Sequence, residues 1–154
     1  MKRGLVNYLF MFLVLVFTMI FPVSADVGCT LTAELVNQDP YPAFPGTYVD
    51  VLFQLNGVDN NCNQGVSVDL FLEYPFSLDG YTTSSRFLES SAYVGLDYNS
   101  FWNNIYRIRV DENALEGDYE LEFRYKEGTA YTWDNYYSIK PILKVEDART
   151  DFEI

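Results

Sequence analysis

Most of the chain after residue 28 alternates between apolar and polar residues with a period of two, and this alternation constrains the fold more than any other feature. Successive side chains of a β-strand point to opposite faces of a sheet, so the pattern predicts strands with one buried face. The predicted strands are Cys29–Leu35, Val49–Leu55, Val66–Leu72, Arg86–Leu88, Ile105–Val110 and Asp118–Tyr125, followed by a last long segment from about Tyr131 to Val145. Seven or eight short strands without a confident helix are typical of an antiparallel β-sandwich.

The stretch VDENALEGDYELEFRY, residues 110–125, changes character halfway along. Its first half resembles the start of a helix, but the seven residues from Asp111 to Gly117 are too few for a stable independent helix. We therefore expect a single helical turn or a wide loop, with Leu115 tucked beneath it. The second half alternates aromatic or apolar residues with charged ones, and this predicts one strand over Asp118–Tyr125.

Prolines, glycines and amide-rich clusters separate the predicted strands. Three prolines and a glycine predict an irregular connection over Asp39–Gly46, and the polar cluster Asp59–Gly65 predicts a turn. We expect a strand end followed by a turn at Tyr74–Gly80, and an edge strand or a loop over Ser90–Phe101.

The first 25 residues have the composition of a secretory signal peptide. Lys2 and Arg3 precede a largely apolar run from Leu5 to Phe21, and Val23-Ser24-Ala25 fits the −3 and −1 positions of a cleavage site. An uncleaved membrane anchor is the alternative, because a membrane span needs about 20 apolar residues. In both cases we expect the remainder to be extracellular or at the cell surface, with membrane contact only through this segment.

Three segments follow from these boundaries. Residues 1–25 are a hydrophobic signal helix that is cleaved or kept as an anchor, and residues 26–146 are one β-sandwich domain. Residues 147–154 have a charged linker composition, in which Phe152 and Ile154 resume alternation as at the start of a following module.

The only two cysteines, Cys29 and Cys62, both lie in the part expected to be exported. An even pair in an oxidising compartment is more often a disulfide than two free thiols. A two-cysteine metal site is the weaker alternative, since the chain contains no histidine to complete it.

Charge and composition exclude several classes of function. Removal of residues 1–25, which hold Lys2 and Arg3 and no acid, changes the formal net charge from −12 to −14. This charge argues against nucleic acid and anionic lipid as partners. The missing histidine removes Ser-His-Asp and Cys-His catalysis, and no two carboxylates stand out as a glycosidase pair. We expect no enzyme and no cofactor.

Aromatic residues are unusually frequent between residues 93 and 137. Sugar-binding modules stack sugar rings on exposed aromatic side chains, and Trp102, Trp133 and Tyr136 are the candidates for such stacking. Asn103 and Asn104 follow the first tryptophan, and Asp134 and Asn135 follow the second. The alternative is that these large rings fill a thin sandwich core.

Two clusters of oxygen-bearing residues are candidate calcium sites. The first is Asp59-Asn60-Asn61 and the second is Asp111-Glu112-Asn113. Calcium takes six to eight oxygens, and neither cluster has the spacing of an EF-hand. Turn formation accounts for both clusters, so no metal site is predicted.

Three stretches resemble S-layer-related Ig-like domains of the archaeal cell envelope. They are Val110–Tyr125 already quoted, Pro45–Val51 (PGTYVDV) and Glu73–Leu78 (EYPFSL), in the family's order and within a match over roughly residues 31–146. The cysteine pair departs from the family. The resemblance implies an Ig-like sandwich that works as an exported structural or adhesive module of the cell envelope, with no catalytic residues to carry over.

The expected partners are other envelope protein modules or cell-surface glycans. The alternative function is a carbohydrate- or protein-binding β-sandwich that uses exposed aromatics, and an enzyme would require two carboxylates converging in a cleft.

Overall fold

The computed structural model describes residues 29–80, 82–90 and 100–147 of the 154-residue chain. These residues form no helix and ten strands: β1 (Thr32–Asp39), β2 (Tyr48–Asn56), β3 (Val66–Phe71), β4 (Phe76–Leu78), β5 (Ser85–Leu88), β6 (Phe101–Val110), β7 (Gly117–Glu120), β8 (Glu122–Glu127), β9 (Tyr137–Ile139) and β10 (Ile142–Val145). The ladders between these strands are antiparallel, so the predicted all-β antiparallel class is confirmed. The predicted signal helix and residues 148–154 of the predicted linker lie outside the described residues.

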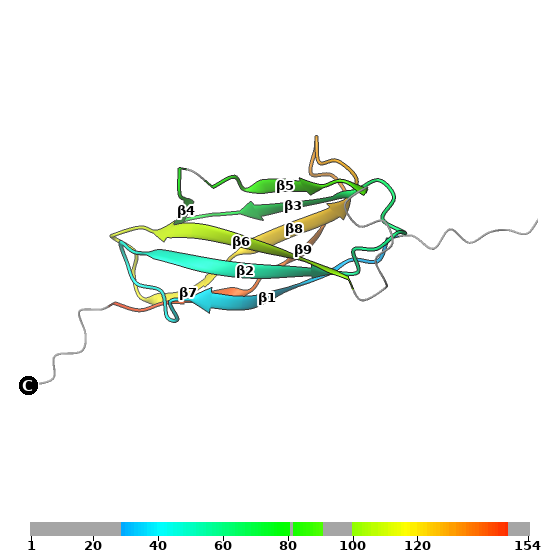
Figure 1. The fold of residues 1–154 in the computed structure, drawn as a ribbon. Helices are drawn as coiled ribbons and strands as arrows, with labels where there is room; N and C mark the ends of the chain where they lie inside the picture. Colours follow the sequence, from blue (N-terminus) through cyan, green and yellow to red (C-terminus); the bar gives the residue numbers. More distant parts are fainter. Residues whose placement is uncertain (1–28, 81, 91–99, 148–154) are drawn as a thin grey trace, which may run out of the picture.

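Two four-stranded sheets form the body of the domain. Sheet I has the strand order β1-β2-β6-β4, and sheet II has the order β5-β3-β8-β9. The two sheets lie as two layers, and β7 and β10 form a small two-stranded sheet at one edge (Figure 1). A parallel bridge between Ala43 and Val145 joins this small sheet to the segment that follows β1. The arrangement is that of a β-sandwich.

The core lies between sheets I and II and is formed by the inward-facing side chains of their strands. Every second residue of β2 from Val49 to Leu55 is fully buried, as the alternation predicts. Phe53 of β2 stacks on Phe123 of β8 with ring centroids 4.4 Å apart. Tyr106 of β6 packs edge-on against both rings, at 6.2 Å from each. Aromatic side chains of both sheets therefore hold the two layers together.

The structure divides two segments that the sequence predicts as continuous. The predicted strand Asp118–Tyr125 is β7 and β8, which belong to different sheets and are separated by the fully buried Leu121. The last predicted segment likewise divides into β9 and β10 at Lys140 and Pro141. The Leu121 N–H donates to the Pro141 carbonyl at 3.0 Å. The two breaks therefore lie side by side, and the paired segments pass together from sheet II to the small sheet of β7 and β10. The alternation continues through this switch, which is why the sequence pattern does not reveal it.

The loop between β6 and β7 corrects the prediction for Leu115. That side chain is 75% exposed, whereas the neighbouring Ala114 is buried. The Asn113 N–H donates to the Asp111 carboxylate at 2.8 Å, and the Ala114 N–H donates to the Asp111 carbonyl at 3.1 Å. This tight turn points alanine rather than leucine toward the core.

Three further boundaries differ from or refine the predictions. Within the segment predicted as a strand end and turn, Phe76–Leu78 forms β4 and pairs with the end of β6. The short strand expected at Arg86–Leu88 is confirmed as β5, which begins one residue earlier. The strand predicted over Ile105–Val110 begins at Phe101 because four more residues pair with β2. Residues 91–99 of the region predicted as an edge strand or loop lie outside the described residues.

The predicted disulfide between Cys29 and Cys62 is confirmed, with Cα atoms 4.5 Å apart. Cys29 precedes β1, and Cys62 lies in the connection between β2 and β3. Because Thr32 pairs with Asn56, the start of β1 lies beside the end of β2, and the disulfide joins the chain just beyond both ends.

Tyr119 ties the loop before β7 to the rest of the domain. Its hydroxyl donates to the Leu115 carbonyl at 2.8 Å, and its ring packs edge-on against Phe76 with centroids 5.9 Å apart. Replacement Tyr119→Phe keeps the ring and removes the hydrogen bond, so we expect the free energy of unfolding to fall by about 1 kcal/mol. Urea unfolding checks this, with Tyr131→Phe as the control because that side chain is 93% exposed. Equal stability of the two variants would contradict a structural role for the hydroxyl.

Candidate functional site

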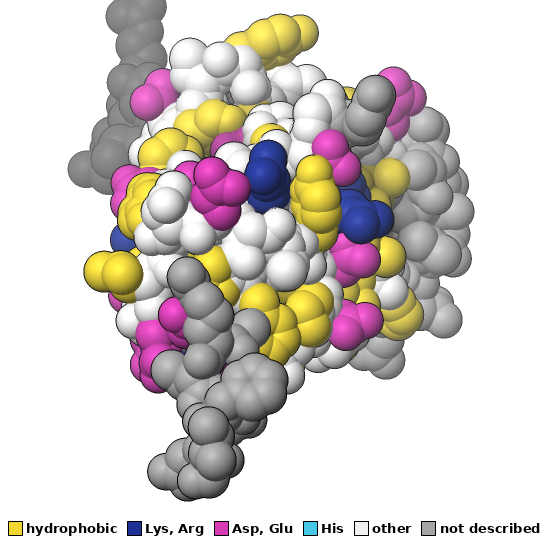
Figure 2. Space-filling view, turned by 90° about the vertical axis from the view of Figure 1, so that its left-hand side faces the viewer, with side chains coloured by type: hydrophobic (Ala, Val, Ile, Leu, Met, Phe, Trp, Pro, Cys, Tyr) yellow, Lys and Arg dark blue, Asp and Glu magenta, His cyan; other side chains and the backbone are white. Residues whose placement is uncertain are grey.

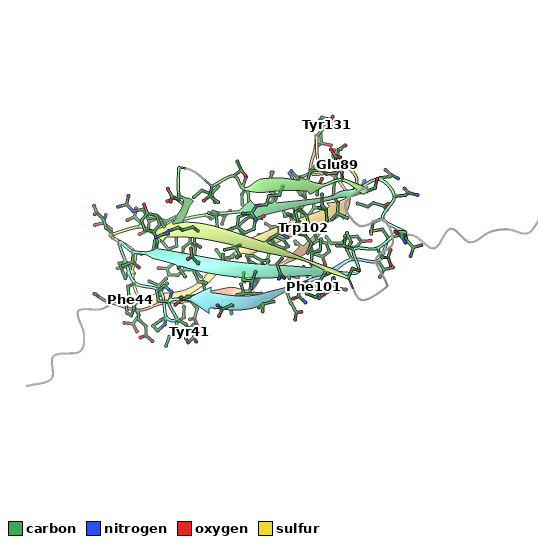
Figure 3. All side chains as sticks on the ribbon, viewed as in Figure 1. Tyr41, Phe44, Glu89, Phe101, Trp102 and Tyr131 are labelled. Carbon is green, nitrogen blue, oxygen red and sulfur yellow. A yellow bond between two sulfur atoms is a disulfide. The ribbon has the colours of Figure 1, made fainter. Side chains whose placement is uncertain are left out.

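The structure places Trp102 apart from the other two candidate stacking residues. Trp102 lies in β6 of sheet I on the same parity as the buried Tyr106, and it packs half-buried against the core. It is the second residue of β6, and Figure 3 shows it away from Tyr131 in the β8–β9 connection. Its position matches the core-filling alternative.

Trp133 and Tyr136, in contrast, lie together in the connection between β8 and β9. Their ring centroids are 6.0 Å apart and their planes are inclined at 82°. The Lys126 ammonium of β8 donates to the Thr132 carbonyl at 2.8 Å and so holds this connection against the strand. The two rings therefore form a corner whose shape is supported by sheet II.

An arginine extends this pair into a row of planar groups across sheet II. The Arg124 guanidinium of β8 lies 4.0 Å from the centroid of the Phe71 ring and 5.1 Å from that of Tyr136. We call the row Phe71, Arg124, Tyr136 and Trp133 the Arg124 stack. Each cation–ring contact contributes about 0.5–1 kcal/mol at a partly exposed position, so the contacts hold the row in place.

Glu122 fixes the centre of the Arg124 stack. Its carboxylate accepts a hydrogen bond from Arg124 at 2.9 Å and one from the Tyr136 hydroxyl at 3.3 Å. The Arg124 bond lowers the pKa of Glu122 below its ordinary value, and the same bond raises the pKa of Arg124. Both side chains are more than four-fifths buried, so the pair is screened less than a fully exposed one.

The lowered pKa of Glu122 has a consequence for stability in acid. A carboxyl group whose pKa is lower in the folded protein contributes stability above its unfolded pKa, and this contribution is lost as the pH falls through the folded value. We expect Glu122→Gln to lower the free energy of unfolding by about 1 kcal/mol at pH 7 and by less at pH 3. Urea unfolding at both pH values checks this, and Glu120→Gln, an exposed neighbour, is the control. A difference that does not shrink in acid would contradict the assignment.

A small pocket adjoins one end of the Arg124 stack. It has a volume of about 70 Å³ and is lined by Phe71, Glu73, Glu120, Glu122 and Lys140. Phe71 belongs to both the pocket and the row, and Glu122, which bonds to Arg124 of the row, also lines the pocket. The pocket thus combines one aromatic wall with three hydrogen-bond acceptors and one cationic donor.

The two calcium candidates are both built as turns. In the first, the Asn61 N–H donates to the Asp59 carboxylate at 2.8 Å, and in the second, the Asn113 N–H donates to Asp111 at the same distance. Asp-x-Asn turns of this kind account for the residue types without a metal. No group of three or more Asp, Glu, Cys or His side chains suited to a metal occurs within residues 29–80, 82–90 and 100–147.

Sequence reasoning found Trp133 and Tyr136 but missed Phe71, Glu122 and Arg124. The alternation does place Glu122 and Arg124 on the outward parity of their strand. The alternation does not predict the register between strands, and in this register Phe71 of β3 pairs with Glu122 of β8. Only that pairing brings the phenyl ring of one predicted strand to the guanidinium of another.

No protein-family model and no curated protein matches this chain. In the part of the chain that the structure describes, no helix is both long enough and apolar enough to cross a membrane.

Proposed function

We propose that this protein is an exported, non-catalytic Ig-like domain that serves as a structural or adhesive module at the cell surface. The observation that carries the proposal is the strand order. Ig domains place strands ABED in one sheet and CFG in the other. If β1, β2, β6 and β4 are A, B, E and D, and β3, β8 and β9 are C, F and G, the observed orders match.

A second feature supports the Ig-like assignment. Ig sandwiches carry a tyrosine near the start of strand F, two residues before a cysteine. The hydroxyl of this tyrosine bonds to the backbone a few residues upstream. Tyr119, which lies in β7 just before β8, makes such a bond to Leu115, and the fully buried Leu121 has the cysteine's spacing from it. The chain departs from the pattern in its Cys29–Cys62 disulfide and in the place of β5, which follows β4 in sequence but pairs with β3.

The placement of the two ends of the described chain suits a module that joins neighbours on both sides. The chain enters near Cys29 at one pole of the sandwich and leaves near Asp147 at the other (Figure 1). At the second pole, hydrophobic and acidic side chains are intermixed and Lys and Arg are sparse (Figure 2). Such a surface favours a protein partner that brings cationic groups to the contact.

The non-catalytic part of the proposal draws on the pocket carboxylates. A glycosidase needs one carboxyl group whose pKa is raised so that it can act as a general acid. In Glu122 the bond to Arg124 lowers the pKa instead. Glu122 is therefore unsuited to act as the general acid of a glycosidase.

Export can be tested by the mass and location of the native protein. We expect a mature chain that begins at Asp26, lies in the medium or on the cell surface, and carries an oxidised Cys29–Cys62 pair. Intact-mass analysis with and without reductant, together with digestion of whole cells by added protease, measures all three. A product that keeps Met1 would show a membrane anchor instead, and a reduced protein in the cytoplasm would refute the proposal.

A further inference from the structure

We propose that the outer side of sheet II binds neutral carbohydrate, with the Arg124 stack as its platform and the adjoining pocket as the place for sugar hydroxyls. This inference deepens the proposed function, because it gives a module exposed at the cell surface a class of ligand. The platform comes from β3, β8 and the connection before β9, and the pocket adds residues that follow β3, end β7 and follow β9. Phe71 belongs to both, and Glu122 joins them because it lines the pocket and bonds to Arg124.

The first argument is the shape and rigidity of the platform. Phe71 and Tyr136 remain 39% and 36% exposed although each lies against the Arg124 guanidinium. Glu122 bonds to both Arg124 and Tyr136, so the planar groups are already held in place before any ligand arrives. A preformed aromatic surface loses little conformational entropy when a ligand binds.

The second argument is the polarity of the pocket. Glu73, Glu120 and Glu122 offer acceptors, and Lys140 offers donors, within a volume of about 70 Å³. A hydroxyl group both donates and accepts a hydrogen bond, so it can satisfy both kinds of side chain at once. Sugar hydroxyls on neighbouring carbons therefore match this lining.

The third argument is charge, which separates neutral sugars from anionic ligands. Three carboxylates in the pocket, on a protein of net charge −12, repel sulfated, phosphorylated or sialylated ligands. A lysine side chain from a protein partner would be attracted by the carboxylates, but its ammonium only donates hydrogen bonds and cannot accept one from Lys140. A sugar hydroxyl can do both, and an uncharged polyol meets no charge repulsion.

The size of the pocket determines how the sugar lies. About 70 Å³ is roughly half the volume of an engineered cavity that holds benzene, so the pocket is too small for a whole sugar ring. We infer that one edge of a ring, with its hydroxyls, enters the pocket. The apolar face of that ring then lies on Phe71, and further units of an oligosaccharide extend along the row toward Trp133.

The test uses the whole mature chain and isothermal titration with neutral hexose oligosaccharides of glucose, galactose and mannose. Heparin fragments and a lysine-rich peptide serve as ligands of the other classes. We expect binding of at least one neutral oligosaccharide, a loss of at least tenfold in affinity on Phe71→Ala and on Glu120→Gln, and little change on Phe71→Tyr. Phe101→Ala is the matched control, because Phe101 is an exposed phenylalanine of sheet I. Thermal melting of each variant identifies any loss that comes from unfolding.

Binding of heparin or the peptide alone would overturn the inference, as would failure of every neutral oligosaccharide to bind. It would also fail if Phe101→Ala weakened binding as much as Phe71→Ala does. None of these outcomes bears on export, which is measured separately in cells, so a failure here leaves the proposed function standing. Conversely, binding by a protein found to be cytoplasmic would preserve the site and refute the surface role.

Discussion

Replacement of Phe123 by alanine is expected to lower the free energy of unfolding by about 3–5 kcal/mol, which is the usual cost of removing a large core ring. Phe123 is fully buried, and its ring stacks on Phe53 and meets the edge of Tyr106. The substitution therefore opens a cavity between the two sheets at the place where their aromatic side chains meet. Urea unfolding followed by tryptophan fluorescence measures the loss.

Phe101→Ala is the matched control for this prediction. It removes the same ring from a position that is 58% exposed on sheet I, so we expect a change within about 0.5 kcal/mol. If both variants lost similar stability, the stacked rings would not be the centre of the core. If Phe123→Ala lost less than about 1.5 kcal/mol, the two layers would be held together by other contacts.

Removal of the disulfide is the second large effect we expect. The Cys29–Cys62 bond closes a loop with a sequence separation of 33 residues. By the chain-entropy model a loop of this length stabilises the fold by roughly 3–4 kcal/mol. The double variant Cys29→Ser, Cys62→Ser should therefore melt roughly 10–15 °C below the wild-type protein.

Reductant provides the control for the disulfide variant. Excess dithiothreitol should lower the melting temperature of the wild-type protein to that of the double variant, and it should leave the variant unchanged. A double variant that melts within about 3 °C of the oxidised protein would show that the adjacent ends of β1 and β2 are held without the bond.

The two proposals differ in which parts of the molecule they need. The structural or adhesive role depends on the strand order and on the poles of the sandwich, whereas the carbohydrate site depends on the outer side of sheet II. Phe71→Ala leaves the poles unchanged, and the disulfide variant leaves the Arg124 stack unchanged. The two sets of variants can therefore be examined independently in the same cells.

The sequence by itself determined the class of the fold and most of the strands, because alternation is a local property. The burial of every second residue from Val49 to Leu55 follows from the pleat of one strand, whatever its partner. The cysteine pair was also predictable, since a chain with two cysteines can form only one intramolecular disulfide.

Tertiary structure decided what depends on pairing between distant strands. The chain passes from one sheet to another at Leu121. The alternation is not interrupted there, because the side chain of Leu121 is itself buried. The side chain of Leu115 points to solvent because hydrogen bonds to Asp111 direct Ala114 inward. The Arg124 stack forms only when the register sets Phe71 beside Glu122 and the β8–β9 connection folds Tyr136 back over Arg124. Register is fixed by the packing of whole sheets, and a one-residue slip would send these side chains to the opposite face.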